Sequence, residues 1–378
     1  MLPAIINTIL VLSALYAPQP LLPVISAEFN VSREAAAALT TSSFIPLAFA
    51  PLVYGYLLES ISATRLLKLT VPLLALTELL LAVTTSFPLL MLIRLAQGLL
   101  IPAILTSLMT YLSGRANTET VQRAMSTYIA ATIFGGFAGR LTSGFIASWL
   151  GWRFSFFGLA IGLLIGTLLL FKLPDSTPLK LTRPKPRALL EILQRPAFTP
   201  IYLTVFCLFL VFAAVMNYLP FRLTELSPLA NELQIGLIYS GYTMGIVTSL
   251  GAPQLARWLG GEAKAIRIGL LCFAATLSGL LLPQVWMLFT TMFLLCAAMF
   301  LVHATASGLV NQLAAGENRG LTNGLYVSFY YAGGTVGSYL PGLIYKQFGW
   351  NGFVASLSLI CLIAYLISRQ ISPRPSSA

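Results

Sequence analysis

The sequence predicts an all-α membrane protein with twelve transmembrane helices in two pseudo-symmetric six-helix bundles. Three observations support this fold class: an apolar composition, a series of long apolar spans, and a repeat between the halves of the chain. Of 378 residues, 57% are hydrophobic and 9% are charged, and the mean hydropathy is +0.86. Soluble domains carry about a quarter charged residues, so a chain this apolar belongs in a lipid bilayer.

The spans are windows of about 18 or more mostly apolar residues, the length that crosses a bilayer as a helix. They lie near 2–24, 36–57, 66–86, 88–112, 124–150, 154–173, 199–221, 234–256, 265–283, 285–312, 321–345 and 353–368.

The first span has no Lys or Arg ahead of its apolar run, and Pro18 directly follows its one plausible cleavage site. We therefore expect this span to remain as a helix, bent by its prolines. Short turns at 86–88 and 151–153 join the third span to the fourth and the fifth to the sixth. Turns this short predict antiparallel neighbours.

A basic, Pro-rich loop at 174–198 separates the sixth span from the seventh. It predicts an N-terminal bundle at 1–173, a cytoplasmic linker, and a C-terminal bundle at 199–378. A shift of 198 residues places GGFAG of 135–139 on GGTVG of 333–337, and Gly151-Trp152 on Gly349-Trp350. The shift matches the six-helix spacing, which indicates duplication.

The Lys and Arg residues predict the orientation. With the N-terminus in the cytoplasm, sixteen of the 22 lie at the inner side, four lie at the outer side, and Arg94 and Arg140 lie inside spans. This is the distribution of the positive-inside rule. The net charge of +11 therefore reflects topology, and we expect no nucleic-acid partner.

Catalytic and metal-binding signatures are missing from the sequence. It holds no Walker loop, HExxH, GxSxG or Cys/His cluster. The four cysteines, which lie inside apolar spans without metal-ligand spacing, are interpreted as buried apolar residues. We expect no enzyme activity, no metal and no organic cofactor.

Two local patterns then resemble motifs of the major facilitator superfamily. The loop at 55–68 resembles Gly-x-x-x-Asp-x-x-Gly-Arg, although Glu59 stands for the Asp and Ser62 and Ala63 replace the Gly-Arg pair. RLAQG at 94–98 resembles the Arg-x-x-Gln-Gly pattern of the fourth helix. With the six-plus-six plan, the resemblance covers essentially the whole chain.

The fifth span resembles the glycine-rich motif of the antiporter members, without its usual Pro and with Arg140 added. The stretches at 16–32 and 217–223, together with GWR after the fifth span, resemble the YnfM-type branch of bacterial efflux permeases. This resemblance implies proton-coupled export of small molecules by a monomer in the bacterial inner membrane.

Small residues recur every four positions in the fifth span, at Ala131, Gly135, Gly139, Ser143 and Ala147. Such stripes let helix backbones approach closely. Gly135 and Gly139 are candidate gating residues on a sliding surface, and static helix packing is the alternative.

Arg140 lies beside that stripe, about 15 Å from the outer end of the span. A mid-membrane Arg costs about 2.5–3.5 kcal/mol even on the lenient insertion scale, so we expect Arg140 to face the bundle or a wet cavity. Its shifted counterpart is Ser338. Arg140 is a candidate substrate-binding residue, and a structural ion pair or snorkelling is the alternative.

Glu78 and Arg94 fall at depths that differ by about 4 Å in an antiparallel hairpin. We expect them to pair in the bilayer, because each alone would be costly. Glu78 and Arg94 are proton-coupling candidates, with a structural pair as the alternative. His303, the single histidine, is a third such candidate, or a hydrogen-bonded packing residue.

The remaining candidates are polar or aromatic residues on spans that line the central cavity in the family. Rings with polar tips suit an amphipathic ligand, although tyrosines also anchor membrane interfaces. The substrate-binding candidates are Tyr16, Gln19, Gln97, Asn217, Tyr218, Tyr239, Tyr242, Tyr326 and Tyr330. The resemblance also implies a gating role at the cytoplasmic side for Glu59 and Arg65, with Glu59 near Thr322 at the start of the eleventh helix.

The sequence therefore predicts a secondary transporter that works by alternating access. We favour proton-coupled efflux of a small organic solute, driven by the proton gradient. The alternative is uptake or uniport of an organic anion drawn by the two buried arginines. A membrane receptor or an intramembrane enzyme is the distant alternative.

Overall fold

The computed structural model describes residues 1–115, 121–175, 186–314 and 319–371, and within these ranges the ordered structure is helical. The chain divides into two compact units. Unit 1 comprises Met1–Leu181 and Leu219–Ser240, and unit 2 comprises Thr182–Tyr218 and Gly241–Ala378. The predicted division at 173 and 199 stays a prediction.

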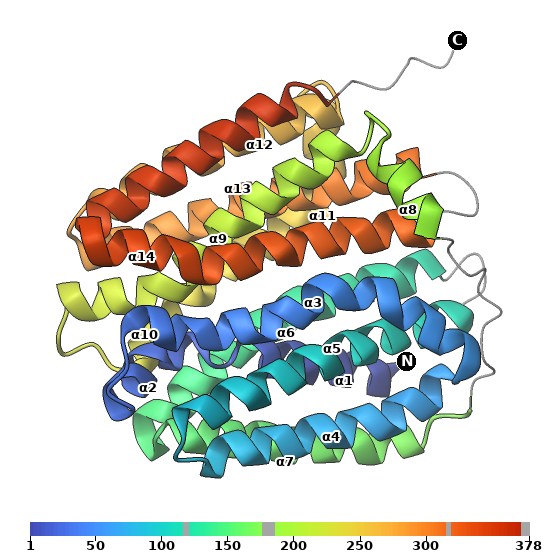
Figure 1. The fold of residues 1–378 in the computed structure, drawn as a ribbon, viewed down its shortest axis with the longest axis horizontal. Coiled ribbons are helices and arrows are strands. Elements are labelled where there is room, and N and C mark those ends of the chain that lie inside the picture. Colours follow the sequence, from blue (N-terminus) through green and yellow to red (C-terminus); the bar gives the residue numbers. More distant parts are fainter. Residues whose placement is uncertain (116–120, 176–185, 315–318, 372–378) are drawn as a thin grey trace. The chain divides into compact units, whose positions relative to one another are not determined.

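The first six predicted spans correspond to helices that contribute to unit 1 (Figure 1). They are α1 (Leu2–Tyr16) with η1 (Gln19–Leu21) and α2 (Leu22–Glu28), α3 (Arg33–Ser60), α4 (Ala63–Val83), α5 (Phe87–Arg115), α6 (Val121–Leu150) and α7 (Trp152–Phe171). Within the unit, α1 packs on α6, α3 on α5, and α4 on α7.

The later spans correspond to a second series of helices, preceded by the short α8 (Pro186–Leu193). They are α9 (Thr199–Leu226), α10 (Glu232–Ile238) with η2 (Tyr239–Gly241) and α11 (Tyr242–Trp258), α12 (Glu262–Leu277) with η3 (Ser278–Leu281), α13 (Val285–Leu313) and α14 (Arg319–Ser368). In unit 2, α13 packs on α11 and α12, and α12 packs on α14.

Ten helical stretches of the described residues are long and apolar enough to cross a membrane, and the last of them covers Gly320–Ser368. Gly349 breaks this stretch with φ 68° and ψ −172°, between the two spans predicted there. With α3 as the remaining predicted span, each of the twelve has a helix. Positive φ favours glycine, and Gly151 has φ 95° at the equivalent Gly-Trp pair.

The glycine repeat corresponds to the same helix contact in each unit. A Cβ on Gly135 would lie 2.6 Å from the carbonyl oxygen of Ile9, and one on Gly333 would collide with the carbonyl of Phe206. Gly139 meets the backbone of Ser13, as Gly337 meets the backbone of Leu210. Both α1 partners map onto their α9 partners with a shift of 197 residues, which supports the inferred duplication.

Candidate functional site

The first predicted span breaks in its middle, and this break organises the candidate site in unit 1. Helix α1 ends at Tyr16, and a 3-10 turn carries Gln19 and Pro20 before α2 resumes. Pro18 has no N–H to donate to the carbonyl of Ala14, so that oxygen needs another donor. Buried in a bilayer, an unsatisfied carbonyl costs several kcal/mol.

Arg94 of α5 supplies hydrogen bonds to that break. Its Nη1 donates to Ala14 O at 3.2 Å and its Nη2 donates to Leu15 O at 2.7 Å. The Nε donates more weakly, at 3.4 Å, to Leu39 O of α3. The guanidinium is 1% exposed. Ser143 of α6 adds a third donor, from Oγ to Ala17 O at 2.8 Å.

Gln97 stands between Arg94 and Glu78, so the expectation of a direct ion pair was wrong. Arg94 Nη1 donates to Gln97 Oε1 at 2.5 Å, and Gln97 Nε2 donates to Glu78 Oε1 at 2.8 Å. The same amide nitrogen lies 3.0 Å from Thr77 Oγ1. The Arg94 guanidinium lies against the carbonyls of the broken α1. The Gln97 amide lies between this guanidinium and the Glu78 carboxylate.

Glu78 is completely buried on α4. Its Oε1 accepts from Gln97, whereas its Oε2 has no hydrogen-bond partner among the residues that the structure describes. A proton can occupy an oxygen of this kind, because burying the negative charge of a carboxylate is costly and protonation removes that charge.

Arg140 of α6 contacts the other side of the same break. Its Nε donates to Gln19 Oε1 at 2.6 Å, and its Nη1 donates to Gly136 O at 2.6 Å. The guanidinium carbon lies 4.1 Å from the ring centroid of Tyr16 and 5.1 Å from that of Tyr239. Cation–π contacts of this kind contribute about 0.5–2 kcal/mol each.

The structure thus brings seven sequence-predicted residues of unit 1 to one break, in two groups. The coupling group contains Glu78, Arg94 and Gln97, and the guanidinium cluster contains Arg140 with Tyr16, Gln19 and Tyr239. Arg140 is 0% exposed, which fits the expectation that it faces the bundle. Its role in substrate binding stays a prediction.

Unit 2 holds a separate aromatic group around His303 of α13. The Tyr326 hydroxyl lies 3.0 Å from both Nδ1 and the backbone oxygen of His303. The Tyr330 ring lies 4.7 Å from the imidazole, and it stacks on Phe209 at 3.7 Å. Tyr242 joins the group through Phe300, at 5.5 Å. The proton-coupling role of His303 stays a prediction.

Asn217 and Tyr218 are fully buried in α9. The Tyr218 hydroxyl lies 3.3–3.4 Å from the backbone oxygens of Ser338 and Tyr339, and its ring packs 5.4 Å from that of Phe353. These are packing contacts within unit 2, and they do not join Tyr218 to the His303 group.

The loop candidates lie at the side predicted to be cytoplasmic. Glu59 belongs to the end of α3, residues 55–60, whose side chains are outside the described residues. The Arg65 backbone N–H donates to Ser62 Oγ at the start of α4, and its side chain is exposed. A hydrogen bond from Lys68 at 2.9 Å holds the pKa of Asp175 below its usual value, and Arg65 adds to this.

At the contact of α1 with α6, sequence reasoning missed Ser13 and named Ser143 only as a small residue of the stripe, not as a hydrogen-bond donor. Ser13 Oγ donates to Gly135 O at 3.0 Å, and Ser143 Oγ donates to Ala17 O. The available signal for Ser143 was the break itself: the N–H of Leu21, four residues after Ala17, donates to Pro18 O instead, which leaves the Ala17 carbonyl for a neighbouring hydroxyl.

Comparison with known proteins gives one consistent result. The family model described as the Major Facilitator Superfamily matches residues 4–260 and 223–378. The chain is 28% identical over 367 residues to the inner membrane transport protein YnfM of Escherichia coli K12, covering 95% of this chain and 87% of that one. It is 26% identical over 369 residues to the MFS-type transporter YybF of Bacillus subtilis 168, covering 95% and 89%.

Two solved structures share the fold. A bacterial homologue of the human lysosomal transporter Spinster, in an inward-facing and occupied conformation, has a TM-score of 0.79 at 14% identity, covering 98% of this chain and 95% of that one. The nucleoside transporter NupG has a TM-score of 0.77 at 14% identity, covering 98% and 97%.

Proposed function

This chain belongs to the major facilitator superfamily, and from that membership we propose that it exports a small organic solute in exchange for protons. It is a multi-pass membrane transporter, like its relatives, which are transporters and not enzymes. Export, proton coupling, cytoplasmic termini, a monomeric state and independence of any cofactor are parts of the proposal. So is a place in a bacterial inner membrane, which the relative from Escherichia coli supports.

One observation carries the proposal: a buried carboxyl joined through an amide to a buried guanidinium at the break of α1. Gln97 accepts from Arg94 and donates to Glu78. A proton on Glu78 would remove its negative charge and weaken its attraction to Arg94, whose other bonds hold the carbonyls of Ala14 and Leu15. Protonation of Glu78 would in this way affect the hydrogen bonds between Arg94 and the backbone of the broken helix.

Glu78→Gln is expected to abolish the dependence of transport on a pH gradient, because the amide cannot take up and release the proton. The measurement is substrate flux in proteoliposomes with and without an imposed gradient. Glu34→Gln is the matched control, since Glu34 is a second buried carboxyl, 6% exposed, on α3. Full coupling in Glu78→Gln would refute the carrier role of Glu78.

Arg140 favours a second candidate, uptake or uniport of an organic anion. Its charge lies between two aromatic rings beside Gln19, where an anionic group would find both a cation and an amide. A uniporter would equilibrate its substrate without changing the pH inside proteoliposomes. An exchanger would move protons with every turnover.

Arg140→Gln is expected to remove the thermal stabilisation that an anionic substrate gives to the wild type. The measurement is a melting-temperature screen of anionic, neutral and cationic compounds on both proteins. An anion that stabilises only the wild type identifies the substrate class and the site together. Equal stabilisation of both proteins by every active compound would contradict substrate binding at Arg140.

A further inference from the structure

Thr77 lies beside Glu78 on α4, and its hydroxyl contacts the amide that joins Glu78 to Arg94. The Thr77 hydroxyl donates to Leu74 O at 2.7 Å, and Gln97 Nε2 lies 3.0 Å from the same Oγ1. A threonine hydroxyl carries one hydrogen. Because this hydrogen is donated to Leu74, Thr77 can only accept a hydrogen bond from the Gln97 amide.

The two N–H groups and the carbonyl of the Gln97 amide therefore each have a partner. One N–H donates to Glu78 Oε1 at 2.8 Å, the other donates to Thr77 Oγ1, and the carbonyl oxygen accepts from Arg94 Nη1 at 2.5 Å. The opposite orientation would place amide N–H groups against the guanidinium and the amide oxygen against the carboxylate. Thr77 and Arg94 thus hold the amide from two sides, with its nitrogen toward Glu78.

The two oxygens of the Glu78 carboxyl differ as a result. Oε1 faces an N–H donor, whereas Oε2 is buried and finds no hydrogen-bond partner in the described ranges of the chain. A hydrogen bond to the charged form of a carboxyl favours that form. The fixed amide therefore stabilises ionised Glu78 at Oε1 and leaves Oε2 as the oxygen that takes up a proton.

Unit 2 has apolar residues at the positions equivalent to Arg94 and Gln97. The starts of α5 and α13 differ by 198 residues, the shift of the internal repeat. This shift places Met292 on Arg94, and Met292 is 0% exposed. It places Leu295 on Gln97, and Leu295 is also 0% exposed. The fold can therefore fill these helix positions without polar side chains, which favours a role beyond packing for the polar group of unit 1.

The charged group that faces Glu78 across the amide is Arg94. Helix α4 packs on α5 and α7, and Arg153, the one titratable residue of α7, lies in its first turn and forms an ion pair there. On α4 itself, Arg65 and Lys68 lie about 15 Å or more from Glu78 along the helix. The local charge is therefore one guanidinium, and the position of the amide between the two groups affects how strongly the carboxylate is stabilised.

We propose that Thr77 is a positioning residue, which holds the Gln97 amide against Oε1 of Glu78 and thereby sets the pH at which Oε2 takes up a proton. The use of that proton in transport rests on the proposed function. The titration of Glu78 does not, because it depends on contacts within unit 1 alone.

The test follows the protonation of Glu78 directly, by infrared spectroscopy of the purified protein in detergent. The carboxyl C=O band that is lost in Glu78→Gln belongs to protonated Glu78, and its intensity against pH gives a midpoint. Thr77→Val and Thr77→Ala remove the acceptor, so the amide can turn and its N–H can move away from Oε1. We expect the midpoint to rise by about 0.5–1 pH unit, which corresponds to about one hydrogen bond. We also expect the band at a higher frequency, because Oε1 then accepts a weaker hydrogen bond.

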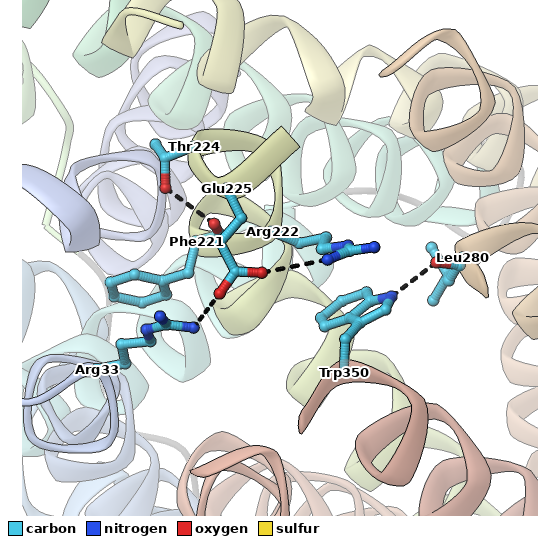
Figure 2. A network of polar contacts seen from close by, with 7 residues as sticks. All are labelled: Arg33, Phe221, Arg222, Thr224, Glu225, Leu280 and Trp350. Atoms are coloured by element: carbon cyan, nitrogen blue, oxygen red, sulfur yellow. Dashed lines mark hydrogen bonds and ion pairs between the residues drawn. The ribbon is translucent and has the colours of Figure 1, made fainter. Parts of the chain in front are cut away.

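Three variants make the result specific. Thr77→Ser keeps the hydroxyl and is expected to keep the wild-type midpoint. Thr70→Val makes the same change on the same helix, at a buried hydroxyl that donates to a backbone oxygen of α4, and is expected to leave the midpoint unchanged. Glu225→Gln removes a carboxylate that forms ion pairs with Arg33 and Arg222 (Figure 2), and it should also leave the midpoint unchanged. Melting temperatures show whether each variant is folded.

Midpoints in Thr77→Val and Thr77→Ala equal to that of the wild type would overturn the positioning role. An equal rise in Thr70→Val, or a wild type without a carboxyl band that depends on Glu78, would overturn it as well. A raised midpoint together with full pH-gradient coupling of transport in Glu78→Gln would leave the positioning role standing and remove the proton carrier. The opposite pair of results would keep the carrier and remove the positioning role, so the two failures are distinguishable.

Discussion

Arg94→Met is expected to lower the free energy of unfolding by about 3–5 kcal/mol, the range seen when one partner of a buried charged network is removed. The methionine fills much of the volume but donates nothing. The carbonyls of Ala14 and Leu15 lose their donors, and Gln97 loses the group that orients its oxygen. Glu78 is left buried without the positive charge that faces it across Gln97. The measurement is the melting temperature of purified protein in detergent.

Two variants control this prediction. Arg65→Met removes an exposed arginine from α4 and is expected to change stability by less than about 0.5 kcal/mol. Arg94→Lys keeps the charge but not the fork that reaches two carbonyls, so it should fall between the wild type and Arg94→Met. A melting temperature of Arg94→Met equal to that of the wild type would show that α1 holds its break unaided.

The helices could be predicted from sequence because a bilayer imposes length and apolarity on every span. The bend of the first span was predictable from local sequence, since Pro18 and Pro20 have no backbone N–H to donate to the helix. Gly349 was predictable only as a boundary between two spans, and the structure adds its positive φ. Each of these features depends on a short stretch of chain.

The partners of Arg94 could not be predicted in the same way. They are backbone carbonyls of α1 and α3, about 55 to 80 positions away in the sequence. Every residue has a backbone carbonyl, so the sequence does not show which ones accept a hydrogen bond from Arg94. Gln97 was within reach, because it lies three residues after Arg94 and so on the same helix face. The helical rise places Glu78 and Arg94 at one level, but it does not show which side chain fills the space between them.

The repeated glycines were predictable in part: the sequence shows the repeat, and the structure shows the contacts. The sequence shows that Gly139 and Gly337 are equivalent, but not what each of them touches. In the structure Gly139 meets Ser13 of α1 and Gly337 meets Leu210 of α9, always at backbone atoms. Backbone cannot move aside as a flexible side chain does, so these positions have no room for a methyl group.

Gly139→Ala and Gly337→Ala are therefore each expected to destabilise the protein by about 1–3 kcal/mol or more, as overpacking does, and to lower its melting temperature. Gly308→Ala is the matched control, because a Cβ there meets nothing within 4 Å, and removing a glycine from within α13 should stabilise by about 0.5–1 kcal/mol. If the stripe were a loose sliding surface, Gly139→Ala would have the melting temperature of the wild type and would only slow transport. Lower melting temperatures at Gly139 and Gly337, with none at Gly308, would identify a close-packed contact that each unit needs in order to fold.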